Sequence, residues 1–105
     1  MIKVCFTRSK DVISGFELSG HSGFSEEGTD IVCAAVSSAS YMTANTLTEI
    51  LGLNPEIKVD EAKMTVKLSK NDAPKAQDIL KGFLLHIEGL QEQYPLNITL
   101  YFTEV

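Results

Sequence analysis

The stretch that decides the fold is GHSGFSEEGTDIVC, residues 20–33, which leads from a glycine-punctuated loop into an apolar segment. From residue 31 to residue 51 the chain contains neither Gly nor Pro, and Gly52 follows as a stop signal. Asp30 suits the N-cap position, because its carboxylate can accept hydrogen bonds from unpaired amides of the first turn. We therefore predict a long helix that begins beside Asp30 and carries Cys33 in its first turn.

Cys33 and His21 are the candidate catalytic residues. A thiol in the first helical turn meets exposed N–H groups and the positive end of the helix dipole, which favour the nucleophilic thiolate. The same amides would stabilise an oxyanion. His21, twelve positions earlier, can act first as a base and then as an acid. A lone cysteine is more often an inert small hydrophobe, so the hypothesis depends on the combination of thiol, imidazole and helix start.

The loop before the helix, residues 19–29, is long for a compact domain, and such loops often cover binding sites. Gly23 and Gly28 would permit positive φ values and the close approach of a peptide. Phe24 either anchors the loop or lines a site for an apolar substrate residue. Ser37 lies one turn after Cys33 and is expected to line the same pocket.

The motif GH, a glycine-containing spacer and DIVCAAVS, within residues 20–37, resembles the ribosomal-processing cysteine protease family (Prp) of bacteria. The resemblance implies a homodimeric cysteine endopeptidase that removes the N-terminal extension of a large-subunit ribosomal protein (number twenty-seven). It also implies a cut after a Phe-rich apolar stretch. Carried over by position, Cys33 would be the nucleophile and His21 its proton partner. Three supporting positions of the motif carry over as well: Gly20, Asp30 and Ser37.

Asp30 has two roles open to it. As an N-cap it would place a negative charge near Cys33 and oppose formation of the thiolate. If it instead holds the imidazolium of His21, it would assist the reaction. The sequence is consistent with both.

Two other functions fit the same residues. The protein could bind a ribosomal or other basic peptide without cutting it, with Cys33 serving only in packing. Alternatively, an activated Cys33 could sense oxidants through a sulfenic acid, although no second cysteine lies nearby in the sequence.

Cys5 is expected to be an ordinary strand residue. We expect no metal or other cofactor, because the Cys and His residues do not show the spacing of metal ligands.

Length and composition constrain the number of domains, the cellular compartment and the partners of the protein. A chain of 105 residues is expected to form a single cysteine protease domain, residues 1–105, around one core. Two cysteines without a CxxC motif, and no signal peptide, favour the cytoplasm. The net charge of −5 argues against direct contact with nucleic acid and suits a basic ribosomal-protein tail. No apolar run reaches the length of a membrane span.

The remaining pattern predicts a ββαββαβ order. Alternating apolar residues predict strands over residues 2–7, 12–18 and 96–103, and a strand pair over residues 57–68. An apolar stripe predicts a second helix over residues 76–90, capped by Asn71 or Asp72 with Pro74 in its first turn.

This order predicts an α/β two-layer sandwich in which both helices cover one face of a mixed or antiparallel sheet. The other face is expected to show polar side chains to water or to a partner: Lys3, Thr7, Thr65, Lys67, Thr99 and Tyr101. The small residues of the first helix favour close packing on the sheet, with a helix contact across a dimer as the alternative.

Overall fold

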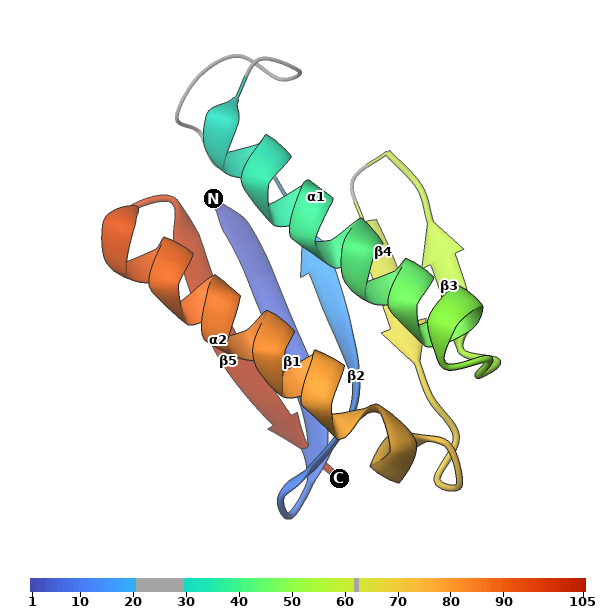
Figure 1. Ribbon diagram of the computed structural model, residues 1–105. Coiled ribbons are helices and arrows are strands. Elements are labelled where there is room, and N and C mark those ends of the chain that lie inside the picture. The colour runs from blue at the N-terminus through green and yellow to red at the C-terminus, as the bar shows by residue number, and fades with distance from the viewer. Residues whose placement is uncertain (21–29, 62) are drawn as a thin grey trace.

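The computed structural model describes residues 1–20, 30–61 and 63–105, which form a five-stranded sheet with two long helices on one face (Figure 1). The strands are β1 (Ile2–Ser9), β2 (Val12–Ser19), β3 (Glu56–Val59), β4 (Lys63–Lys67) and β5 (Ile98–Glu104). The helices are α1 (Ile31–Asn45) and α2 (Gln77–Gln93). The predicted α/β two-layer sandwich and its element order are confirmed.

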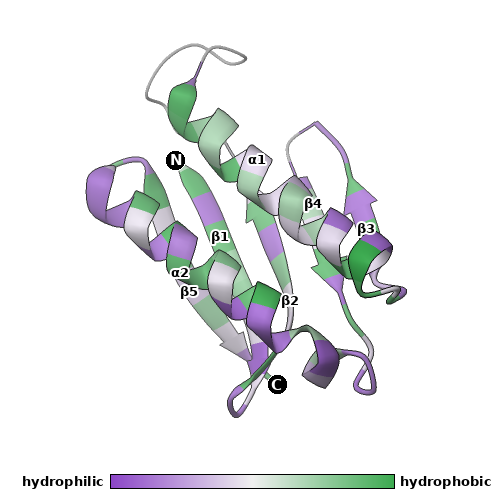
Figure 2. Cartoon of the chain, viewed as in Figure 1, coloured by the Kyte–Doolittle hydropathy of each residue, from purple (hydrophilic) through white to green (hydrophobic). Residues whose placement is uncertain are grey.

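The sheet is mixed, with the strand order β3-β4-β2-β1-β5. β5 runs parallel to β1, whereas the other neighbouring strands are antiparallel. Figure 2 shows apolar and polar bands alternating along β1 and β2. The apolar side chains face the helices, and the register sets polar residues of all five strands side by side on the other face, as predicted.

The core lies between the sheet and the two helices. Phe83 of α2 packs against Phe16 and Phe6 of the sheet, with ring centroids 4.7 and 5.5 Å apart. Leu80 and Ile87 of the same helical stripe are fully buried. The predicted stripe is thus confirmed as the core face of α2. Neither α1 nor α2 is long and apolar enough to cross a membrane, and the same holds for every described helix.

The predicted cap of the second helix was wrong. The chain enters α2 through a 3-10 turn, Ala73–Ala76, whose N-cap residue Asp72 makes no capping hydrogen bond with its side chain. Instead, Gln77 fixes the start of α2 to the sheet. Its Oε1 accepts a hydrogen bond from the Ile13 N–H at 2.9 Å, and its Nε2 donates to the Ile13 carbonyl at 2.8 Å.

Other differences lie at the ends and edges of elements. The first helix continues beyond α1 as a π-helical turn, Thr46–Ile50, and Gly52 at φ +65° then reverses the chain, as predicted. Leu96 lies outside β5 and is 85% exposed. Ile57 and Val59 lie in a strand, as expected, but both side chains are exposed, because β3 is an edge strand.

A glycine-to-alanine pair tests the packing of the sheet. A Cβ at Gly15 would lie 2.3 Å from the Val66 carbonyl oxygen of β4, so Gly15→Ala should lower the free energy of unfolding by about 1–3 kcal/mol. Gly82 has open space around it in α2, so Gly82→Ala should raise stability by about 0.5–1 kcal/mol. Urea denaturation of both variants checks this. A Gly15→Ala protein as stable as the wild type would contradict the close approach of β2 and β4.

Candidate active site

Asp30 caps the N-terminus of α1. Its backbone is extended (φ −71°, ψ 114°), and its Oδ1 accepts hydrogen bonds from the N–H groups of Val32 at 2.9 Å and Cys33 at 3.2 Å. The Asp30 carbonyl accepts the first helical bond, from the Ala34 N–H at 3.0 Å. The helix therefore begins where the sequence predicts, and Cys33 is its third residue.

The second oxygen of the same carboxylate is also buried. Asp30 is only 4% exposed, and within the described residues its Oδ2 has no hydrogen-bond partner. A buried carboxylate oxygen without a donor is costly, so buried polar atoms in native proteins are nearly always hydrogen-bonded to the protein or to water. Capping thus occupies one oxygen and leaves the other for a donor.

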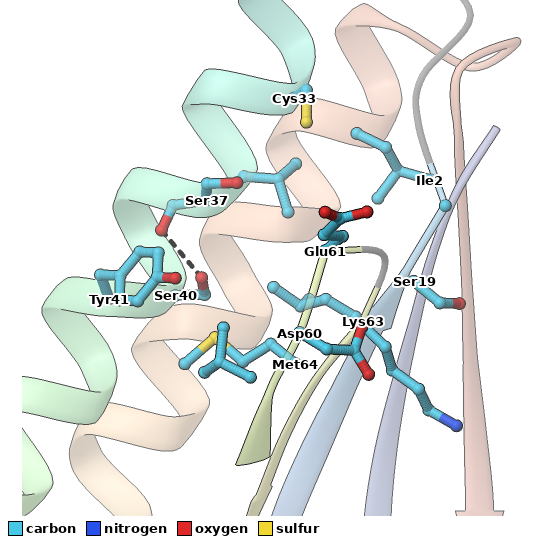
Figure 3. Close-up of a pocket in the computed structure, with 14 residues that line it drawn as sticks. Ile2, Ser19, Cys33, Ser37, Ser40, Tyr41, Asp60, Glu61, Lys63 and Met64 are labelled. Carbon is cyan, nitrogen blue, oxygen red and sulfur yellow. Dashed lines mark hydrogen bonds between the residues drawn. The ribbon is translucent and has the colours of Figure 1, made fainter. Parts of the chain in front are cut away.

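Cys33 lies at a pocket of about 160 Å³ between α1 and the β3–β4 hairpin (Figure 3). Cys33, Ser37 and Tyr41 follow one another at four-residue intervals, so a single face of α1 forms one wall. The apolar part of the lining comes mainly from the sheet and from the inner side of α1: Ile2, Leu18, Val36, Val59 and Met64. The hairpin turn adds charged side chains on the opposite side: Asp60, Glu61 and Lys63.

Gly20 joins the pocket from the end of β2. Its φ is +81°, and a Cβ there would lie 2.4 Å from the Met1 carbonyl oxygen. Only glycine tolerates both the left-handed conformation and this approach to the start of β1. Three predicted site residues, Gly20, Cys33 and Ser37, are therefore brought together. Asp30 caps α1 but is not among the residues that line the pocket, and the four remaining predicted residues lie outside the described residues: His21, Gly23, Phe24 and Gly28.

The family model of the cysteine protease Prp matches residues 1–99 of this chain. The chain belongs to this family. The ribosomal processing cysteine protease Prp of Bacillus subtilis (strain 168) is 29% identical over 105 residues, covering 93% of this chain and 94% of its own length.

Two crystal structures are similar to this chain in fold as well as in sequence. The SMU.848 protein from Streptococcus mutans is 35% identical, with a TM-score of 0.87 over 100% of this chain and 96% of that one. The essential ribosomal processing protease Prp from S. aureus, in complex with a covalently linked product peptide, is 26% identical. Its TM-score is 0.90, over 98% of this chain and 100% of its own.

Membership of the Prp family identifies the activity as that of a cysteine-type endopeptidase. It favours this reading over the non-catalytic peptide-binding module and the redox-sensing thiol that the sequence also allowed.

The cap bears on one detail of the expected chemistry, the binding of the oxyanion. The amides at the helix start were expected to bind the oxyanion, but the two nearest the thiol, those of Val32 and Cys33, already donate to Asp30. The capping hydrogen bonds therefore compete with any oxyanion for these donors.

Cys5 is an ordinary strand residue of β1, as expected. It lies on the face of the sheet opposite the helices, as the alternation predicts, yet it is only 8% exposed. Its Sγ lies 3.1 Å from the Thr103 Oγ1 of β5. Both cysteines are free thiols, and Cys5 contributes nothing to the pocket that contains Cys33.

The sequence did not reveal the hairpin turn at Asp60 and Glu61 as part of this pocket. It predicted a turn there, but nothing in the turn marks it as functional, and it comes almost thirty positions after Cys33 in the chain. Its place at this pocket follows from the pairing of β4 with β2, which brings the turn to the same end of the sheet as the start of α1.

The capping role of Asp30 can be measured through stability. Asp30→Ala should lower the free energy of unfolding by about 0.5–2 kcal/mol, because the amides of Val32 and Cys33 lose their acceptor. Asp30→Asn keeps a capping oxygen and should cost much less. Urea denaturation followed by circular dichroism compares the two variants. An Asp30→Ala protein as stable as Asp30→Asn would show that the cap contributes nothing.

Proposed function

We propose that this protein is a ribosomal-processing endopeptidase that removes the N-terminal extension of a large-subunit ribosomal protein (number twenty-seven). The observation that carries the proposal is the Cys33 thiol, set in the capped first turn of α1 at a pocket, in a chain of the Prp family. The ribosomal role is supported by relatives named for ribosomal processing. The apolar lining, which includes Leu18 and Met64, supports a cut after a Phe-rich apolar stretch.

Cys33 is the proposed nucleophile and His21 its proton partner. His21 accepts the thiol proton, and the thiolate sulfur attacks the carbonyl carbon of the scissile peptide bond. The tetrahedral intermediate breaks its C–N bond as the imidazolium returns the proton to the leaving amine. Water, activated by the neutral imidazole, then hydrolyses the thioester, which releases the new carboxyl end and restores the thiol.

The supporting residues have separate parts in this scheme. The buried Oδ2 of Asp30, which has no partner within the described residues, is suited to accept a hydrogen bond from the His21 imidazolium. Asp30 would then cap α1 with one oxygen and orient the imidazole with the other. Ser37 offers a hydroxyl to the substrate from the same wall of the pocket as Cys33. Gly20 keeps the end of β2 close enough to β1 for the pocket to form.

The segment between His21 and the helix is proposed to bind the substrate. Gly23, Phe24 and Gly28 are proposed to contact the substrate peptide, with the aromatic ring facing an apolar residue of the extension. We further propose that residues 1–105 act as one protease domain in a cytoplasmic homodimer that needs no cofactor and does not contact nucleic acid directly. Sedimentation equilibrium at twice the chain mass of 11.5 kDa would support the dimer, and a single-chain mass would contradict it.

Mass spectrometry of the precursor ribosomal protein tests the activity. The wild type should shorten the precursor at one bond, whereas Cys33→Ala and His21→Ala should each lower kcat/KM at least about a thousandfold. Cys5→Ser is the matched control, because Cys5 does not line the pocket, and it should retain turnover. Retained cleavage by either catalytic variant would contradict the mechanism. An unchanged precursor mass with the wild type would contradict the proposed substrate.

The second role of Asp30 has its own test. Asp30→Asn keeps a capping oxygen but removes the charge that would hold the imidazolium, so kcat should fall at least about tenfold while stability changes little. Steady-state kinetics and urea denaturation on the same preparation separate the two effects. If Asp30→Asn cleaves as fast as the wild type, Asp30 serves only as a helix cap.

A further inference from the structure

We infer that the free edge of β3 binds the substrate as an added strand, through backbone hydrogen bonds from Ile57 and Val59, beside the pocket that contains Cys33. The inference rests on the proposed function, in which this pocket receives the scissile bond. Figure 1 shows β3 at the outer edge of the sheet, and within the part of the chain that the structure describes it pairs with β4 alone. Such an edge presents backbone N–H and C=O groups with which an extended peptide can pair.

The register identifies the backbone groups of β3 that face outward. Along an antiparallel pair, residues bonded to the partner strand alternate with residues whose N–H and C=O groups point the other way. The Asp60 N–H donates to the Lys63 carbonyl at 2.9 Å, so these two residues form a bonded pair. Two positions before Asp60, Lys58 is bonded to β4 in the same way. Ile57 and Val59 therefore direct their backbone groups to the free edge.

The opposite side of β4 leads to the same assignment. Leu68, directly after β4, donates its N–H to the carbonyl of Ser14 in β2 at 2.8 Å. Even-numbered residues of β4 thus face β2, and odd-numbered residues such as Thr65 face β3. Because Thr65 lies opposite Lys58, the bonded position of β3 is again Lys58. Two separate hydrogen bonds therefore identify the same outward-facing pair of residues.

The side chains of β3 differ between the two faces of the sheet. Ile57 and Val59 are 37% and 52% exposed and lie on the face that the helices cover, opposite buried residues of β4. On the other face, the Lys58 Nζ pairs with the Glu56 Oε1 at 3.3 Å, so opposite charges lie side by side. A peptide paired with this edge would meet apolar surface with every second side chain and polar surface with the others.

Val59 connects this edge to the proposed site of cleavage. It belongs both to the end of β3 and to the lining of the pocket that contains Cys33. Since an extended chain advances about 3.3 Å per residue, only a few residues separate the paired segment from the scissile bond. β5 forms the other edge of the sheet, but none of its residues is among the described residues that line this pocket. The shared residue therefore favours β3 as the edge and the substrate as its occupant.

Amide hydrogen exchange tests the pairing without cleavage. A short peptide from the N-terminal extension of the precursor is added at saturation to the Cys33→Ala protein. Exchange of the Ile57 and Val59 amides should slow at least about tenfold, because both donate to the bound strand. The Leu100 amide is the control. It faces the free edge of β5, since the alternation that contains the Val105 bond to β1 excludes it, and it should exchange as before.

A proline variant tests the same edge through cleavage. Val59→Pro removes an outward N–H and leaves the bonds to β4 in place, because proline is tolerated where the N–H of an edge strand faces solvent. It should raise KM for the peptide about three- to tenfold. Val59→Thr keeps the N–H and the branched side chain, and should retain a KM near that of the wild type. Urea denaturation checks that both variants are folded.

The outcomes separate this inference from the proposed function. If the wild type cuts the precursor but the peptide protects neither amide, the inference is wrong and the proposed function stands. If the precursor is not cut, the proposed function fails. Slowed exchange at both amides would then still support the pairing, and unchanged exchange would overturn it as well. Slow exchange in the free protein that is lost on dilution would assign the edge to a second copy of the chain, and would also overturn the inference.

Discussion

The pair of hydrogen bonds from the first turn of α1 to the Asp30 carboxylate determines where the site is built. Oδ1 accepts hydrogen bonds from the amides of Val32 and Cys33, and this fixes the residue at which the helix begins. The position of the Cys33 thiol relative to the ends of the strands is fixed with it. Each later residue of the same face then follows at intervals of four, which places Ser37 and Tyr41 along the pocket wall. The cap therefore sets the position of the proposed nucleophile and of the pocket wall that α1 forms.

The same cap affects the charge and the hydrogen-bond donors that are available at Cys33. It places a carboxylate beside the proposed nucleophile and occupies two amides that could otherwise bind an oxyanion. A mechanism that uses Cys33 must therefore add positive charge and hydrogen-bond donors from another part of the chain. An imidazolium at the buried Oδ2 of Asp30 would supply the charge and would also satisfy that oxygen.

Local signals made the central elements predictable from the sequence. Asp30 as a cap, Gly52 as a stop and the apolar stripe of α2 each depend on neighbouring residues, and the structure agrees with all three. Features that depend on distant pairing were missed. Asp72 has the right chemistry for a cap, but Gln77 reaches across to β2 and fixes α2 in its place. The hairpin turn joins the pocket only because β4 pairs with β2, which no local pattern specifies.

The most direct test of the central claim is to trap the nucleophile. A peptide chloromethyl ketone that ends in Phe should add once to the folded protein, and peptide mapping by mass spectrometry should locate the adduct on the Cys33 sulfur, with Cys5 unmodified. The Cys33→Ala protein should gain no mass under the same conditions. An adduct on Cys5 with Cys33 left free, or a wild-type protein that cuts its substrate yet is neither modified nor inhibited by the reagent, would contradict the account.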